Sequence, residues 1–337
     1  MITKPNQAII HTVGLLTGML FCAGCMLASI RFGFLTVSWN DVWASIAKYD
    51  SAINEQIVVR TTRLPRAFIA AAVGASLAVA GAIMQAVTRN PLASPSVMGI
   101  NAGATLAVVS AITVFSVTHM GTIVWIAFGG AAVAAAFVYL LGSLGRDGLT
   151  PLKIILAGSA MTALFVSFTQ GLLVRNENGL QDVLFWLTGS IAGREQSMLM
   201  AVIPYMSIAW LGALLLSKQL NILAMGEEAA KGLGQRTTAV TLLSGFLVVM
   251  LAGGSVAVAG PIGFIGIVIP HIVRGITGLD YRLLIPYSAL LGAILLLLAD
   301  VAARFIIMPE EMPVGIMMAV IGAPFFIYIA RKELRSL

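Results

Sequence analysis

The side chains that could carry out chemistry are few and scattered in this sequence. Its 337 residues include 3 His, 2 Cys and 14 acidic residues. No Gly-Lys dipeptide occurs, so the phosphate-binding loop of nucleotide hydrolases is missing. No His-Glu-x-x-His pattern occurs, and Cys22 and Cys25 alone cannot provide the four ligands of a zinc site. The sequence therefore predicts no catalytic residue, no metal site and no cofactor, which argues against an enzyme.

The elements that must position any functional residue are apolar helices. Hydrophobic residues make up 59% of the chain, charged residues 10%, and the mean hydropathy is +0.98, which indicates a membrane protein. The net charge of +6 is spread among apolar runs, which excludes a nucleic-acid partner. A helix needs about 20 apolar residues to cross a bilayer. Runs without Asp, Glu, Lys or Arg cover residues 5–30, 67–88, 90–145, 154–174, 196–217, 237–273, 283–299 and 312–330.

Two of these runs are too long for one helix. We expect the first to break between residues 118 and 121, and the second at Gly253-Gly254 or at Gly260-Pro261, where helix propensity is low. The result is an all-α, polytopic membrane protein with ten transmembrane helices in a single domain, residues 1–337. Residues 5–30 have full spanning length, which favours a first span over a cleaved signal peptide.

The charges between the spans predict the orientation. With both termini in the cytoplasm, Lys and Arg are in excess on the inner side, as the positive-inside rule requires for a protein of the cell membrane. One outer segment departs from this trend because it carries Arg60, Arg63 and Arg66. These outer arginines therefore need a separate explanation.

A short internal repeat indicates a transporter. Residues 78–83, Ala-Val-Ala-Gly-Ala-Ile, recur at residues 257–262 as Ala-Val-Ala-Gly-Pro-Ile. The two copies lie in spans of opposite direction, so spans 2–5 and 7–10 would form an inverted repeat, an architecture used by transporters. Six small residues can also match by chance in such a composition.

The source of energy for such a transporter would lie outside this chain. Carboxylates, on which proton- or sodium-coupled carriers depend, are almost missing from the spans; Asp300, four residues before Arg304, fits an interfacial ion pair equally well. The inner loop at residues 220–236 has helix formers in its middle and glycines at both ends. Acids at its start and Lys231 near its end favour a helix from Glu227 to Leu233. A motor subunit could bind such a helix, although an ordinary amphipathic loop is the alternative.

Several strings resemble the iron-siderophore and cobalamin permease family of ABC importers, in order and over most of the chain from residue 55. These strings are Arg63-Leu64-Pro65-Arg66, Arg89-Asn90-Pro91-Leu92-Ala93-Ser94-Pro95, Gly226-Glu227-Glu228-Ala229-Ala230, Gly260-Pro261-Ile262-Gly263-Phe264, Pro270-His271-Ile272-Val273-Arg274 and Gly322-Ala323-Pro324-Phe325. The resemblance implies two permease subunits, alike or paralogous, two cytoplasmic ATP-binding subunits and an extracytoplasmic substrate-binding protein.

The resemblance also implies roles for particular residues. The ATPase-coupling residues would be Gly226, Glu227, Glu228, Ala229, Ala230, Gly232, Leu233 and Gly234. A cytoplasmic gate would include Thr150, Pro151 and Leu152, where Pro151 can start the next helix. Docking of the binding protein is expected at Arg63, Arg66 and Arg304, which the outer position of these arginines supports independently, because an arginine can hold a carboxylate through two hydrogen bonds. The alternative is that Arg63 and Arg66 only reach the lipid headgroups and that Arg304 pairs with Asp300.

The expected substrate is a ferric siderophore, moved into the cytoplasm by a permease that needs no metal ligand because the siderophore ligates the iron. Haem or cobalamin remains an alternative, and an ion-coupled secondary carrier a less favoured one. A pathway for such a chelate would be mildly polar, with candidate lining residues Gln85, Asn101, Thr162, Ser167 and Thr169.

Overall fold

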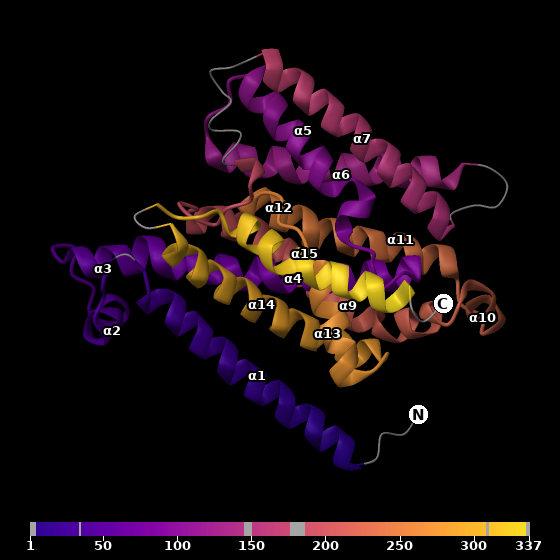
Figure 1. Ribbon diagram of the computed structural model, residues 1–337, viewed down its shortest axis with the longest axis horizontal. Helices are drawn as coiled ribbons and strands as arrows, with labels where there is room; N and C mark the ends of the chain where they lie inside the picture. The colour runs from indigo at the N-terminus through magenta and orange to yellow at the C-terminus, as the bar shows by residue number, and fades with distance from the viewer. Residues whose placement is uncertain (1–4, 34, 145–149, 176–185, 308–309, 335–337) are drawn as a thin grey trace.

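The described part of the chain consists of helices and their connections. A computed structural model describes residues 5–33, 35–144, 150–175, 186–307 and 310–334, and every regular element within these ranges is a helix (Figure 1). The elements are α1 (Pro5–Arg31), α2 (Trp39–Ala47), α3 (Asn54–Val58), η1 (Val59–Arg63), α4 (Leu64–Thr88), η2 (Pro95–Met98), α5 (Ile100–Thr113), α6 (Met120–Ser143), α7 (Pro151–Arg175), α9 (Gln196–Ala224), α10 (Glu227–Gly232), α11 (Thr237–Val248), η4 (Val249–Gly253), α12 (Gly254–Ala259), α13 (Ile265–Thr277), α14 (Tyr281–Ile306) and α15 (Val314–Leu334).

The apolar helices fall into two groups by length. Within the described residues, seven are long and apolar enough to cross a membrane: Ile9–Arg31, Asn54–Thr88, Met120–Ser143, Pro151–Val174, Gln196–Ala224, Thr237–Ala259 and Tyr281–Ile306. Three shorter apolar helices cover Ile100–Thr113, Ile265–Thr277 and Val314–Ile329. The predicted all-α membrane class is thereby confirmed. The count of ten spans and the inverted repeat stay predictions.

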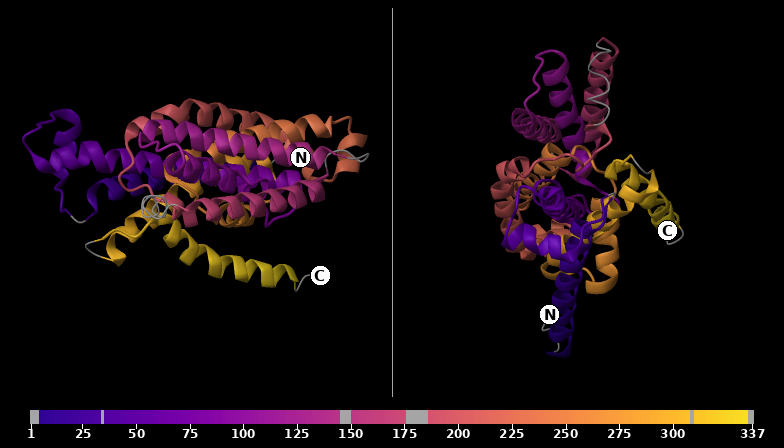
Figure 2. Two further views of the ribbon diagram at one scale, coloured as in Figure 1. Left: turned by 90° about the horizontal axis from the view of Figure 1, so that it is seen from above. Right: turned by 90° about the vertical axis from the view of Figure 1, so that its left-hand side faces the viewer.

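Helix α4 is the centre of the molecule. Of the most apolar window of Asn54–Thr88, 83% is buried within the chain, against 17% for Ile9–Arg31. Helices α9, α13 and α14 pack around α4, whereas α1 runs along the edge and packs mainly on α14 (Figures 1 and 2). Small residues allow this close packing: a β-carbon on Gly74 would overlap the backbone of Gly292.

Helices α5, α6 and α7 pack on one another and form a separate group beside this core (Figure 1). The group contacts the core mainly through η4 and α12, and α7 also touches α4 directly. The right-hand view of Figure 2 shows it rising from the core on the side opposite α1. The core around the buried helix α4 therefore has α1 on one side and the group of α5, α6 and α7 on the other.

The predicted helix breaks are located by the backbone. Helix α6 begins at Met120 with the imidazole of His119 accepting a hydrogen bond from Thr122 N, so the break near residue 118 is confirmed. In the second long run the helix passes through Gly253 as a π-helical segment and stops at Gly260, whose φ of 72° a side chain would disfavour. The break therefore lies at Gly260-Pro261 and not at Gly253-Gly254.

Helix α5 is shorter than the apolar run at residues 90–118 predicts. Its helix covers only Ile100–Thr113, and a single 3-10 turn, Pro95–Met98, precedes it. Two prolines, Pro91 and Pro95, lie at the start of the run. Proline has no amide hydrogen and disfavours helical geometry in the residue before it, so the first part of the run cannot continue as a helix.

Candidate functional site: the coupling helix and the outer arginine cluster

The short helix α10 connects α9 to α11 at one end of the molecule, called here the α10 end (Figure 1). Gly226 precedes it with a φ of 118°, and Gly234 follows it with a φ of 77°. Lys231 Nζ lies 2.9 Å from Glu227 Oε1, one helical turn earlier. Ala230 is fully buried while Glu228 is exposed. The predicted short helix between two glycines is confirmed, and the ATPase-coupling role of its exposed face stays a prediction.

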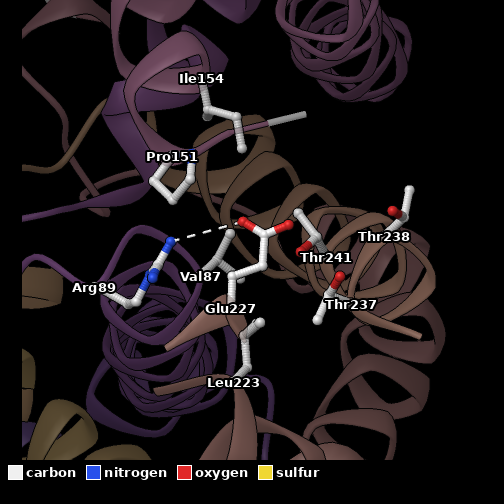
Figure 3. Close-up of a pocket in the computed structure, with 9 residues that line it drawn as sticks. All are labelled: Val87, Arg89, Pro151, Ile154, Leu223, Glu227, Thr237, Thr238 and Thr241. Carbon is white, nitrogen blue, oxygen red and sulfur yellow. Dashed lines mark ion pairs between the residues drawn. The ribbon is translucent and has the colours of Figure 1, made fainter. Parts of the chain in front are cut away.

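A pocket joins α10 to the helices that end or begin beside it (Figure 3). Its lining residues are Val87, Arg89, Pro151, Ile154, Leu223, Glu227, Thr237, Thr238 and Thr241. Arg89 caps the C-terminus of α4, and its Nη2 lies 4.0 Å from Glu227 Oε2. The acidic start of α10 is thus linked by charge to the end of the central helix.

The predicted gate residues lie where α7 starts. Pro151 is the first residue of α7 and lines the same pocket as Glu227 (Figure 3). The carbonyl oxygen of Thr150 accepts a hydrogen bond from Ile154 N at 3.1 Å. The side chain of Leu152 is 66% exposed. The structure therefore brings Pro151 and Glu227 of α10 together in one pocket and leaves Leu152 out of its lining.

At the end of the molecule opposite α10, the side chain of Arg66 is bound by two acidic residues. Its Nε lies 3.0 Å from each carboxylate oxygen of Asp300, and its Nη2 lies 2.8 Å from Oδ1. Its Nη1 donates to Glu311 Oε2 at 2.5 Å. Asp300 is fully buried, whereas the side chain of Glu311 is 37% exposed. Arg66 therefore joins α4 to α14 and to the loop before α15.

Arg304 and Arg63 complete this cluster, called here the outer arginine cluster (Arg63, Arg66 and Arg304). Arg304 shares Asp300 with Arg66 and also donates to the carbonyl oxygen of Ser29 at 2.7 Å. Arg63 donates to the carbonyl oxygens of Ile30, Arg31 and Leu35. Both arginines therefore fasten the end of α1 and the chain that follows it to the core.

The structure thus brings together the three arginines that the sequence analysis groups for docking, but it buries them. Their exposed fractions are 5%, 5% and 4%. The ion pair of Asp300 with Arg304 follows from their spacing of four residues, whereas the contacts of Arg66 with Asp300 and Glu311 join distant parts of the chain and have no local signal. The docking role stays a prediction.

Two cavities with mostly apolar walls lie between α5, α7 and the start of α13. The larger, about 420 Å³, is lined by Asn101, Thr162 and Thr169, three of the residues expected along the pathway, together with Ser96, Ala102, Thr105, Val166, Gln170, Leu173 and Leu187. The smaller, about 250 Å³, shares Ser96 and Asn101 and extends to Gly266. Ser167 is exposed, and its hydroxyl donates to the carbonyl oxygen of Ala163. The few polar groups in the walls of both cavities are uncharged.

The chain is similar in sequence to permease proteins of Bacillus subtilis. It is 52% identical over 305 residues to the Bacillus subtilis protein named "Probable siderophore transport system permease protein YfiZ", covering 90% of this chain and 91% of that protein. It is 43% identical to the iron(3+)-hydroxamate import system permease protein FhuB of the same organism, with 94% and 82% covered.

A solved structure has the same fold. It is that of a metal-chelate type ABC transporter in an inward-facing conformation, with a TM-score of 0.83 and 28% sequence identity, covering 96% of this chain and 99% of that chain. The model of the FecCD transport family matches residues 20–332. The chain therefore belongs to the FecCD transport family and is a membrane transport permease rather than an enzyme.

Proposed function

We propose that this chain is the permease subunit of an ABC importer that moves a ferric siderophore chelate into the cytoplasm, driven by ATP hydrolysis in a separate subunit. The observation that carries the proposal is α10, a short helix with exposed Glu228 and Ala229 whose first residue is ion-paired with the end of the central helix. Movement of this helix would be passed to α4 through the ion pair of Glu227 with Arg89 and to α7 through the residues that line the shared pocket. The names of the relatives support iron chelates as the substrate class.

The complete importer would contain a second permease subunit, two cytoplasmic ATP-binding subunits and an extracytoplasmic binding protein. Both termini would lie in the cytoplasm, and Pro151, with Thr150 and Leu152, would belong to a gate at the α10 end. Proteoliposomes with the assembled complex should accumulate radiolabelled ferric hydroxamate only when ATP and the binding protein are present. Uptake driven by a proton gradient without the ATPase would support a secondary carrier instead, and uptake of haem or cobalamin alone would correct the substrate.

Reversing the charge of Glu228 tests the coupling helix. We expect Glu228→Arg to weaken association with the ATP-binding subunit by about tenfold or more, the equivalent of about 1.4 kcal/mol, because an exposed charge at the contact is inverted. Glu195→Arg is the matched control, since it inverts an exposed acid just before α9, at the far end of that helix from α10. Co-purification and ATPase activity measure the effect, and equal association of both variants would contradict the assignment.

We also propose that the outer arginine cluster receives acidic residues of the binding protein, with Arg66 reached first because Glu311, its partner, is partly exposed. Glu311→Gln removes an acid that competes for Arg66 and repels an acidic partner. We expect this variant to bind the binding protein a few times more tightly, a change of about 0.5–1 kcal/mol. Glu310→Gln is the control, because Glu310 is exposed and is next in sequence. Unchanged affinity in Glu311→Gln would leave Arg66 with a structural role only.

A further inference from the structure

A further cavity lies at the α10 end and shares Arg89 with the pocket shown in Figure 3. Its volume is about 500 Å³, and its lining residues are Gln85, Arg89, Pro91, Ala224, His271, Arg274, Gly275, Leu279 and Tyr281. They come from the ends of α4, α9 and α13 and from the start of α14. The cavity is distinct from the two uncharged cavities beside α5 and α7.

The lining of this cavity carries cations and no acid. Arg89, His271 and Arg274 contribute basic groups, and no Asp or Glu is among its nine described lining residues. Arg274 and Tyr281 lie side by side in the wall of the cavity, the first at the end of α13 and the second at the start of α14. A concave surface with charge of one sign concentrates ions of the other sign, and guanidinium groups bind carboxylates and phosphates through paired hydrogen bonds.

Gln85 adds an independent indication of a ligand. It is 3% exposed, and its Nε2 donates to the carbonyl oxygen of Gly266 at 3.1 Å. Its Oε1 has no hydrogen-bond partner among the described residues, although it is buried and the residue lines the cavity. A buried acceptor without a donor is uncommon in folded proteins. A hydroxyl group or a bound water that accompanies an anion would satisfy it.

Arg89 connects the cavity to the coupling helix. Its φ of 51° places it in the left-handed region, which residues with a side chain rarely adopt, so its position is imposed by the surrounding structure. The same residue lines the cavity, the pocket shown in Figure 3 and another pocket that is formed with residues of α10. An anion in the cavity and Glu227 would therefore share one guanidinium group.

We propose that this cavity is a binding site for an oxyanion, a carboxylate or phosphate group held by Arg89 and Arg274, and that its occupation weakens the ion pair of Arg89 with Glu227. Two ligands have this chemistry. The first is a carboxylate-bearing ligand that leaves the transport pathway, and this possibility rests on the proposed function. The second is the phosphate of an anionic lipid, which is independent of that function. In either case the ligand signals to α10 through Arg89.

The test uses the full chain in nanodiscs of neutral phosphatidylcholine, titrated with citrate and with inorganic phosphate. We expect saturable binding in a thermal-shift or calorimetric assay, weakened about tenfold or more in Arg89→Gly and Arg274→Gln, since each variant loses a pair of charge-assisted hydrogen bonds. Arg89→Gly is chosen because glycine accepts the left-handed backbone, so this variant retains the fold. Arg282→Gln, an exposed arginine outside the cavity, is the control and should bind as the wild type does.

Nanodiscs that contain phosphatidylglycerol separate the two sources. If phosphatidylglycerol raises thermal stability through Arg89 and Arg274 and prevents citrate binding, the site belongs to a lipid, and the proposed transport function is unaffected. If citrate binds equally well in both lipids, the site belongs to a soluble ligand. The proposal is overturned if citrate, phosphate and phosphatidylglycerol all fail to bind, or if they bind equally well in the two cavity variants and in the wild type.

Discussion

Replacement of Asp300 with asparagine is expected to destabilise the permease so strongly that most of the protein is unfolded. Asp300 is fully buried and accepts hydrogen bonds from both Arg66 and Arg304. Without its charge, two arginine side chains that are only 7% and 3% exposed lose the carboxylate between them. Removing one member of a buried ion pair costs about 3–5 kcal/mol, because a charge is left uncompensated away from water. Thermal unfolding of the detergent-solubilised protein and its size-exclusion profile measure the loss.

Glu311→Gln is the matched control for this prediction. It removes a carboxylate from the same Arg66, but from the partly exposed side, where an ion pair contributes about 1 kcal/mol or less. We therefore expect Glu311→Gln to unfold close to the wild-type temperature. If Asp300→Asn is equally stable, the buried network does not hold α4 and α14 together, and the arginines are free to serve docking alone.

The order and class of the helices follow from the sequence because charges are excluded from the lipid. Runs without charge marked the membrane helices, and glycine with proline marked the break that the structure has at Gly260-Pro261. The other candidate break, Gly253-Gly254, is helical because its glycines are packed: a β-carbon on Gly254 would lie 3.0 Å from the side chain of Met206. Tertiary packing overrides helix propensity there, and no local pattern reveals it.

The candidate site was predictable only where its signals are local. Helix α10 has its glycines, acids and lysine within one short stretch, so its form follows from the sequence alone. The partners of Arg66 do not, because Asp300 lies 234 residues away. The distribution of charges along the sequence predicts that Arg66 is exposed on the outer side of the membrane. In the structure its side chain is buried between Asp300 and Glu311. Pairing of this kind depends on which helices are neighbours.

Helices α4 and α13 cross at Gly81 and Gly266, where their backbones are in contact. A β-carbon on Gly81 would lie 2.0 Å from the carbonyl oxygen of Gly266 and 2.4 Å from its Cα, so a side chain requires the helices to separate. One turn further along α4, Gln85 donates to the same carbonyl oxygen of Gly266. The distance between these helices therefore determines the shape of the cavity lined by Gln85, Arg89 and Arg274 as well as the packing.

Gly81→Ala is accordingly expected to destabilise the permease strongly, by about 1–3 kcal/mol or more, the cost of overpacking a close contact that is formed by backbone atoms. Gly129→Ala makes the same chemical change on α6 at an exposed position, where a β-carbon would meet nothing within 4 Å. There the loss of glycine should stabilise the helix by about 0.4–1 kcal/mol, because the unfolded chain becomes less flexible. The two substitutions should thus shift the unfolding temperature in opposite directions, and uptake should fall only in Gly81→Ala. Equal stability of Gly81→Ala and the wild type would mean that α4 and α13 are not in contact through their backbones, and the geometry of the cavity at Gln85 would have to be revised with it.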